Sequence, residues 1–137
     1  MSPKSGIRKS GETCRVLVVE DDFDSAEFLC VMIEDAGHEC RVALNAVEAR
    51  TIVEEFTPEV ALIDIGLPGE TGYDLVKSLK RDLGECRFVA VTGYAGAELS
   101  KQSLESGFEA HLTKPVTMQL LLAVLDRCAS DLEASSS

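Results

Sequence analysis

The sequence is poor in aromatic residues, lacks paired cysteine motifs and contains no long apolar run. Aromatic residues make up 5% of the 137 residues and Trp is absent, so we expect an aliphatic core. No apolar run approaches the roughly 20 residues that span a bilayer, and residues 1–12 show no apolar stretch typical of a signal peptide. The cysteines have no C-x-x-C spacing, which argues against a zinc site or a disulfide framework and favours a reduced, cytoplasmic setting. They are Cys14, Cys30, Cys40, Cys86 and Cys128.

Basic residues are also scarce relative to acidic ones. The chain has 13 Lys and Arg against 24 Asp and Glu, a formal net charge of −11. Nucleic acids and anionic membranes are themselves negative, so such a surface repels both. We therefore expect no direct nucleic-acid binding and no membrane contact.

The length fits one domain, which we place at residues 13–133. A flexible tail is predicted at residues 1–12 and a disordered tail at residues 134–137. Five short runs, several rich in β-branched residues, predict strands, and apolar residues at three- and four-residue spacing predict a helix after each. The strands are expected at Arg15–Glu20, His38–Ala43, Val60–Asp64, Arg87–Thr92 and Glu109–Thr113. The helices are expected at Phe23–Ala36, Asn45–Phe56 with Asn45 as the N-cap, Tyr73–Asp82, Ala97–Ser106 and Thr117–Leu132.

This alternation predicts an α/β fold of the doubly wound type, a (βα)5 parallel sheet with helices on both faces. Functional groups of such sheets gather at the carboxyl ends of the strands. Asp21 and Asp22 follow the first strand, Asp64 ends the third, Thr92 ends the fourth and Lys114 follows the fifth. All of them should meet at one edge of the sheet.

Crowded carboxylates repel one another unless they are protonated, paired or bound to a metal. A set of oxygen ligands suits Mg²⁺. Phosphoryl transfer needs a nucleophile, a metal and donors for the remaining negative charge. Asp64 can be the nucleophile, the two aspartates after the first strand can hold the metal, and Thr92 and Lys114 can take phosphoryl oxygens.

Four segments together carry a resemblance to a known family. The segments are Asp21-Asp22, Asp64-Ile65-Gly66-Leu67-Pro68 with Gly72 beyond it, Val91-Thr92-Gly93-Tyr94 and Thr113-Lys114-Pro115. In these the chain resembles the response-regulator receiver family over about residues 13–133. The resemblance implies a flavodoxin-like fold with a five-stranded parallel sheet of order 2-1-3-4-5.

The resemblance also implies roles for single residues around the acidic site. Asp64 matches the aspartate that family members phosphorylate. Asp22 matches the direct metal ligand, and Asp21 matches an acidic neighbour that acts largely through water. Gly66 matches the position whose backbone carbonyl binds the metal.

Further roles fall on the last two strands. Thr92 matches the switch hydroxyl and Lys114 the family's lysine, and the peptide bond between Lys114 and Pro115 is expected to be cis. His111 stands at the family's aromatic switch position, where it could add pH sensitivity. Thr71 stands where many members have Asp, a peripheral departure.

The function implied is a switch that accepts a phosphoryl group onto Asp64 from a phosphohistidine donor, either a histidine kinase or a histidine phosphotransfer protein. It would require Mg²⁺ (or Mn²⁺), dephosphorylate itself slowly and not turn over as an enzyme. It would control a partner or output as a stand-alone regulator or as the receiver of a hybrid histidine kinase. Receivers often dimerise through the face of helix four, strand five and helix five, and the sequence does not decide whether this one does.

Three other functions are weighed against this one. A pseudo-receiver that only binds partners would have no need of the complete acidic cluster. A phosphatase of the haloacid-dehalogenase type usually has an acid two residues after its nucleophile, where this chain has Gly66. A flavin-binding flavodoxin would need a phosphate loop after the first strand, where Glu20, Asp21 and Asp22 would repel phosphate. A separate hypothesis is that Tyr94 gates water near the site.

Overall fold

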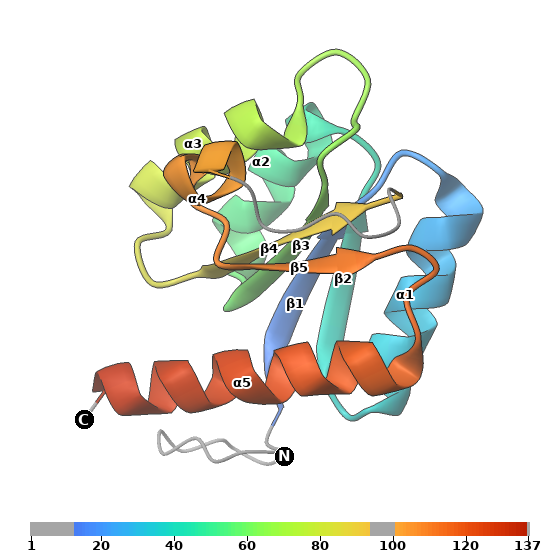
Figure 1. The fold of residues 1–137 in the computed structure, drawn as a ribbon, viewed down its shortest axis with the longest axis vertical. Helices are drawn as coiled ribbons and strands as arrows, with labels where there is room; N and C mark the ends of the chain where they lie inside the picture. The colour runs from blue at the N-terminus through green and yellow to red at the C-terminus, as the bar shows by residue number, and fades with distance from the viewer. Residues whose placement is uncertain (1–12, 94–100, 137) are drawn as a thin grey trace.

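The structure, a computed structural model, describes residues 13–93 and 101–136. Strands and helices alternate along the chain (Figure 1). The strands are β1 (Arg15–Val19), β2 (Glu39–Ala43), β3 (Val60–Asp64), β4 (Arg87–Thr92) and β5 (Ala110–Thr113). The helices are α1 (Phe23–Asp35), α2 (Ala46–Phe56), α3 (Gly72–Asp82), α4 (Lys101–Ser106) and α5 (Met118–Ser136).

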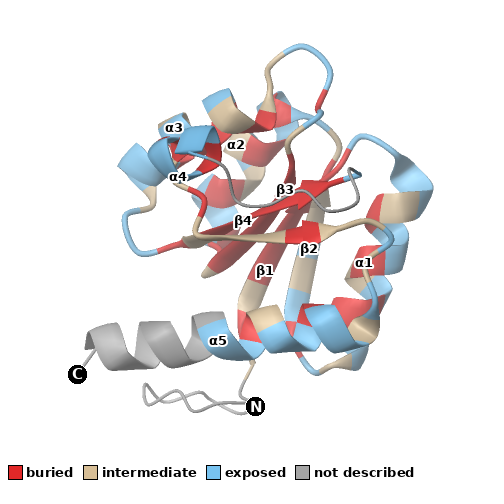
Figure 2. Ribbon diagram, in the orientation of Figure 1, coloured by how far each residue is buried: buried red, intermediate tan, exposed pale blue. Residues whose placement is uncertain are grey.

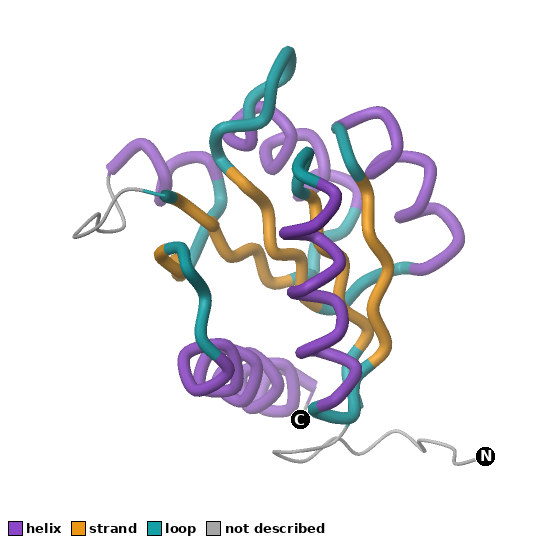
Figure 3. Tube along the Cα trace, turned by 90° about the vertical axis from the view of Figure 1, so that its right-hand side faces the viewer, coloured by secondary structure: helices purple, strands orange, loops and turns teal. Residues whose placement is uncertain are grey.

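The five strands form one parallel sheet in the order β2-β1-β3-β4-β5. The predicted flavodoxin-like topology is therefore confirmed. Val16 pairs with Val60 across β1 and β3, and Val60 in turn aligns with Arg87 of β4. The strands lie between two groups of helices, as the rotated view in Figure 3 shows.

Side chains of the central strands alternate between two separate apolar layers, because successive residues of a strand point to opposite faces. Val16 and Val18 pack with α1 and α5, whereas Leu17 and Val19 pack with α2 and α3. All four are almost fully buried. Both faces of β1 and β3 are covered, which explains their continuous apolar sequences. Figure 2 shows the buried residues concentrated on the strands and the inner faces of the helices.

Polar side chains and residues in the left-handed backbone conformation mark the ends of the helices. Asn45 caps α2 as predicted, since its side chain accepts a hydrogen bond from the Glu48 N–H at 2.9 Å. Gly37 follows α1 with φ +98°, a conformation that suits glycine. Thr57 ends α2 with φ +47°, although a β-branched residue is disfavoured there.

Some element boundaries differ from the prediction. β1 ends at Val19, so Glu20 lies just beyond the strand. α5 continues to Ser136, into the segment that the sequence predicted as a disordered tail. The predicted tail at residues 1–12, the start of the fourth helix at Ala97 and the water-gating hypothesis for Tyr94 all fall outside the described residues.

No helix among residues 13–93 and 101–136 is long and apolar enough to cross a membrane. Where side chains are described, four cysteines are not in disulfides: Cys14, Cys30, Cys40 and Cys86. Cys14 and Cys86 are buried, so they act as small apolar residues of the core.

Candidate functional site

The carboxyl ends of the strands bring together groups that are far apart in the sequence. Glu20 comes directly after β1, Asp64 is the last residue of β3, and Lys114 directly follows β5. The parallel register places these ends at the same edge, because Val19 aligns with Ile63 and Thr92 of β4 with Thr113 of β5. This edge is the site that the sequence predicted.

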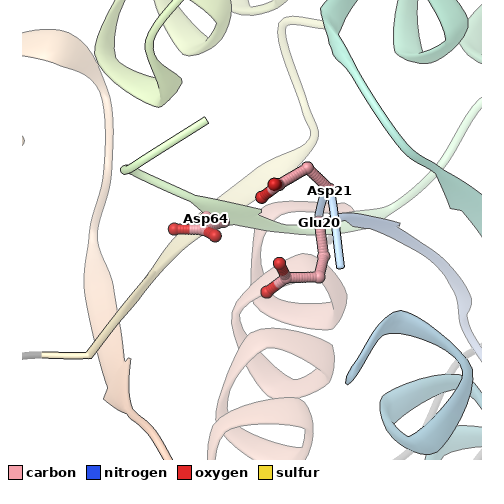
Figure 4. A group of neighbouring side chains, drawn as sticks. All are labelled: Glu20, Asp21 and Asp64. Atoms are coloured by element: carbon pink, nitrogen blue, oxygen red, sulfur yellow. The ribbon is translucent and has the colours of Figure 1, made fainter. Parts of the chain in front are cut away.

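Three carboxylates meet at this edge. Oxygens of Glu20, Asp21 and Asp64 all lie within 4.8 Å of one another, and Figure 4 shows the three side chains gathered around one point. Glu20 and Asp64 are 2% and 8% exposed, whereas Asp21 is open to solvent. Two unit charges about 4 Å apart repel by about 4 kcal/mol at an effective dielectric of 20. The cluster therefore needs positive charge to balance it.

Lys114 supplies part of that charge. Its Nζ lies 2.7 Å from Glu20 Oε1 and 3.3 Å from Asp64 Oδ2. Burial alone would lower the pKa of Lys114, but the adjacent Glu20 and Asp64 carboxylates outweigh it and raise that pKa. The ammonium group is therefore held in its charged form between the two buried carboxylates.

Burial has the opposite effect on Glu20. It raises the pKa of this carboxyl group, and the contacts with Lys114 and with the Asp22 N–H only partly offset the effect. The Asp22 N–H donates to Glu20 Oε2 at 3.0 Å. Glu20 Oε1 faces the ammonium group at 2.7 Å. The two oxygens of this buried carboxylate therefore have different partners, the Lys114 ammonium group and the Asp22 N–H.

Asp22 has a different place from the one the sequence predicted. Its carboxylate caps α1, where it accepts hydrogen bonds from Ser25 N–H at 3.0 Å and Ser25 Oγ–H at 2.6 Å. These bonds lower the pKa of Asp22. The expected direct metal ligand thus lies outside the acidic cluster, and Glu20, which the sequence analysis left out, is in it with Asp21.

A clear signal for this correction was present in the sequence. Asp22 is followed three residues later by Ser25, and Asp directly before a helix is a preferred N-cap. Ser25 binds Oδ2 of Asp22 with both its N–H and its hydroxyl, and the acidic cluster consists of Glu20, Asp21 and Asp64. The acidic pair at the sheet edge is therefore shifted one residue toward the N-terminus, to Glu20 and Asp21.

The loop after β3 holds the Asp64 carboxylate from the other side. Gly66 N–H donates to Asp64 Oδ1 at 2.8 Å, which fixes the rotation of the carboxylate. Gly72 packs so closely that a Cβ atom there would lie 2.7 Å from Asp64 O and 2.7 Å from Ile65 Cα. The backbone at Asp64 therefore depends on the absence of a side chain at Gly72.

Thr71, where many members of the family carry Asp, caps α3. Its Oγ1 accepts a hydrogen bond from Asp74 N–H at 3.2 Å. Thr and Asp are both favoured N-caps, so the substitution keeps the local function of the position.

The fourth and fifth strands place the remaining predicted residues. Thr92 is buried at the end of β4, and its carbonyl accepts a hydrogen bond from Lys114 N–H at 2.7 Å. The Lys114–Pro115 peptide bond is cis, as expected. His111 is half-buried in β5, where it aligns with Ala90 of β4. It lies two residues before Thr113, the last residue of the strand.

The donor atoms of this edge fit a small divalent cation. Glu20, Asp21 and Asp64 offer carboxylate oxygens from two adjacent strand ends, and the Gly66 backbone adjoins them. Mg²⁺ favours such oxygen ligands and keeps several waters, so a partly exposed cluster is suitable. Beside the cluster a pocket of about 340 Å³ is lined by Glu20, Lys114, Phe28 and Pro115, among others.

Residues 16–126 match the family model of the response regulator receiver domain. The chain belongs to this family. As a receiver domain it spans nearly all of the similar single-domain proteins. It is 36% identical over 116 residues to a 14.6 kDa protein of Leptolyngbya boryana, an alignment that covers 82% of this chain and 88% of that protein.

A solved structure supports the same assignment. The CheY-like response regulator receiver domain protein from Methanospirillum hungatei superimposes with a TM-score of 0.82 at 30% identity, covering 90% of this chain and 99% of that one.

A longer relative is the phosphate regulon transcriptional regulatory protein PhoB of Pseudomonas aeruginosa. It is 32% identical to the receiver domain over 112 residues, which are 80% of this chain and 49% of PhoB. The chain thus spans about half the length of this relative.

Proposed function

We propose that the chain accepts a phosphoryl group onto Asp64 from the phosphohistidine of a histidine kinase or a histidine phosphotransfer protein. The reaction depends on Mg²⁺ and switches the conformation of the domain. The observation that supports this most is the position of Asp64. It is a nearly buried carboxylate at a strand end, beside two further carboxylates and within 3.3 Å of a lysine ammonium group.

In the proposed reaction a carboxylate oxygen of Asp64 attacks the phosphorus atom. An acyl phosphate O–P bond forms and the P–N bond to the imidazole breaks, so that its electron pair returns to the ring nitrogen. The Gly66 N–H holds the carboxylate in a fixed orientation for this attack. Glu20, Asp21 and Asp64, with the Gly66 carbonyl, would hold Mg²⁺, which offsets negative charge on the phosphoryl oxygens.

Lys114 and Thr92 would contact the other phosphoryl oxygens. Lys114 already points at Asp64 Oδ2, and Thr92 ends the strand next to β3. The Lys114 N–H bond to the Thr92 carbonyl joins the ends of β4 and β5. A shift of Thr92 toward the phosphoryl group would therefore be passed to β5, which carries His111, as a change in the populations of two states.

The donor must reach Asp64 from the solvent side of the sheet edge. The pocket lined by Glu20 and Lys114 lies next to this edge, and Phe28 of α1, which also lines it, is 62% exposed. We propose that the donor's imidazole enters along this side, with Phe28 in contact with the donor protein.

For the output that the switch controls, we propose only its general kind. PhoB, which is similar to this chain over about half its own length, is by its name a transcriptional regulator. We propose that the phosphorylated receiver controls a partner or an attached output, with the face of α4, β5 and α5 as the surface that changes and that could pair two receivers. The domain itself is proposed to act stoichiometrically, with slow loss of the phosphoryl group, and not to turn over a substrate.

The proposed function is tested by intact-mass analysis after incubation with Mg²⁺ and acetyl phosphate. We expect the mass of one added phosphoryl group in the native chain, and none in Asp64→Asn or in a sample with EDTA. If the native chain gains no mass and also fails to bind beryllofluoride, which mimics a bound phosphoryl group, the protein is a pseudo-receiver and the proposal is wrong.

A further inference from the structure

Away from the acidic cluster, one arginine joins three elements of the chain at a single point. Arg50 of α2 donates through Nη1 to Glu70 Oε1 at 2.8 Å and through Nη2 to Glu70 Oε2. Its Nη2 also donates to Ser78 Oγ of α3 at 2.9 Å. Glu70 belongs to the loop between β3 and α3, so the guanidinium group connects that loop to both neighbouring helices.

The loop held by this contact is the one that orients the phosphoryl acceptor. It starts after Asp64, and its Gly66 N–H binds Asp64 Oδ1. Gly69 has φ +80°, and Pro68 and Gly69 are exposed, so this tip of the loop has little packing around it. The rest of the loop is held by the Ile65 N–H bond to the Val91 carbonyl at 3.1 Å, by the burial of Leu67 and by the Glu70 carboxylate bound by Arg50.

The geometry of the contact favours positioning over a simple surface ion pair. A guanidinium group that binds a carboxylate through two parallel hydrogen bonds fixes its direction as well as its distance. Ser78 adds a third bond, and its own hydroxyl donates to the Leu75 carbonyl at 3.1 Å, which holds it against α3. The two side chains of the ion pair are 41% and 31% exposed.

We propose that Arg50 is a positioning residue, which holds the loop between β3 and α3 through Glu70 and so sets the orientation of the Gly66 backbone and of the Asp64 carboxylate. The consequence for phosphoryl transfer rests on the proposed function. The consequence for the loop does not rest on the proposed function, because it concerns only the hydrogen bond of the Gly66 N–H.

The loop is tested first, without metal or phosphodonor, by NMR measurement of amide hydrogen exchange. In Arg50→Met and in Glu70→Gln we expect the Gly66 amide to exchange faster than in the native chain, because a loop that opens locally more often exposes the amide to solvent. The amide of Leu62, in the middle of β3, should keep its rate. Arg81→Met, which removes one exposed positive charge from α3, is the matched control and should change neither amide.

The same variants are then phosphorylated with acetyl phosphate and titrated with Mg²⁺ by calorimetry. We expect slower phosphorylation and weaker Mg²⁺ binding in Arg50→Met, partial recovery in Arg50→Lys, and no additional loss when Glu70→Gln is combined with Arg50→Met. If Gly66 and Leu62 exchange rise by the same factor, Arg50 serves only global stability and the inference is wrong. An unchanged Gly66 rate would also overturn it. If the native chain takes no phosphoryl group, the proposed function fails, and the Gly66 rates still decide the role of Arg50.

Discussion

Adjacent aspartates at the end of β1 face different partners. Asp21 lies in the acidic cluster with Glu20 and Asp64, whereas the carboxylate of Asp22 binds the first turn of α1 through Ser25. The difference follows from the direction of the chain as it leaves the strand and starts the helix. It gives the two positions separable effects on metal binding and on folding.

We predict that Asp21→Asn weakens Mg²⁺ binding by at least about tenfold, because it removes a charged oxygen ligand from the cluster. Asp22→Asn should bind Mg²⁺ almost as the native chain does, since Asn is an equally good N-cap. Calorimetric titration of both variants measures this. Equal losses of Mg²⁺ affinity in the two variants would show that Asp22 also binds the metal.

A second prediction at this scale concerns Gly72. A methyl group there would press against the backbone of Asp64 and Ile65 at 2.7 Å, so Gly72→Ala must displace β3 or α3. We expect a loss of about 1–3 kcal/mol in the free energy of unfolding, typical of overpacking, measured by urea denaturation. Gly84→Ala, where a Cβ atom would meet nothing within 4 Å, is the control and should cost much less.

At the scale of single elements, the residue that caps the C-terminus of α2 has a conformation that it disfavours. Thr57 has φ +47°, whereas glycine follows α1 and α4 with positive φ, at Gly37 and Gly107. We predict that Thr57→Gly raises the free energy of unfolding by up to about 1 kcal/mol, because the left-handed conformation costs a non-glycine residue about 1–2 kcal/mol and part of that gain is lost to a more flexible unfolded chain. A fall in the urea midpoint would contradict this account.

The pair that joins α2 to the loop before α3 should respond to pH. The hydrogen bond from Arg50 lowers the pKa of Glu70. A carboxyl group with a depressed pKa in the folded state stabilises the fold above its ordinary pKa, and this contribution disappears as the pH falls through the folded-state value.

We therefore predict that Glu70→Gln lowers stability at neutral pH and has no effect at a pH where Glu70 is protonated in the native chain. The difference should stay below about 1 kcal/mol, because both side chains are partly open to solvent. Urea midpoints measured from neutral to acidic pH give the comparison. A loss of the same size at every pH would show that charge is not the cause.

The sequence predicted the elements well and the side-chain contacts less well. The buried strands can be predicted because a strand covered on both faces is continuously apolar. Val60–Asp64 is such a strand, an apolar run that ends in an acidic residue. Asn45 as an N-cap follows from local chemistry. The ion pair between Arg50 and Glu70 could not be predicted, because it depends on how α2 packs beside α3. The place of Glu20 in the acidic cluster was missed, because the sequence analysis took Asp21 and Asp22 as the acidic pair and left out the residue before them.

At the scale of the whole molecule, negative charge dominates both the surface and the site. The chain carries a formal charge of −11, and two of its acidic groups at the sheet edge are almost fully buried. A cation that binds only the folded state stabilises it by RT ln(1 + [L]/Kd), where [L] is the free cation concentration and Kd its dissociation constant. Binding of Mg²⁺ at the acidic cluster would therefore stabilise the fold.

We predict that Mg²⁺ raises the melting temperature of the native chain by more than that of Asp21→Asn. At a Mg²⁺ concentration 100 times the dissociation constant the expected gain is about 2.7 kcal/mol. Differential scanning calorimetry with and without Mg²⁺, at ionic strength matched with NaCl, measures it. An equal rise in both proteins would show general screening of charge in place of binding at the cluster.

The order of the strands has a consequence for the protein during its synthesis. Glu20, Asp64 and Lys114 lie at the ends of β1, β3 and β5, and α5, which follows Lys114, packs Leu121 and Leu125 against the sheet. A ribosome therefore makes Lys114 well after Asp64, and the edge has all of its groups only when most of the domain has been synthesised. On the proposed function, a nascent or truncated chain without Lys114 would not accept a phosphoryl group, and it would not compete with finished molecules for the donor.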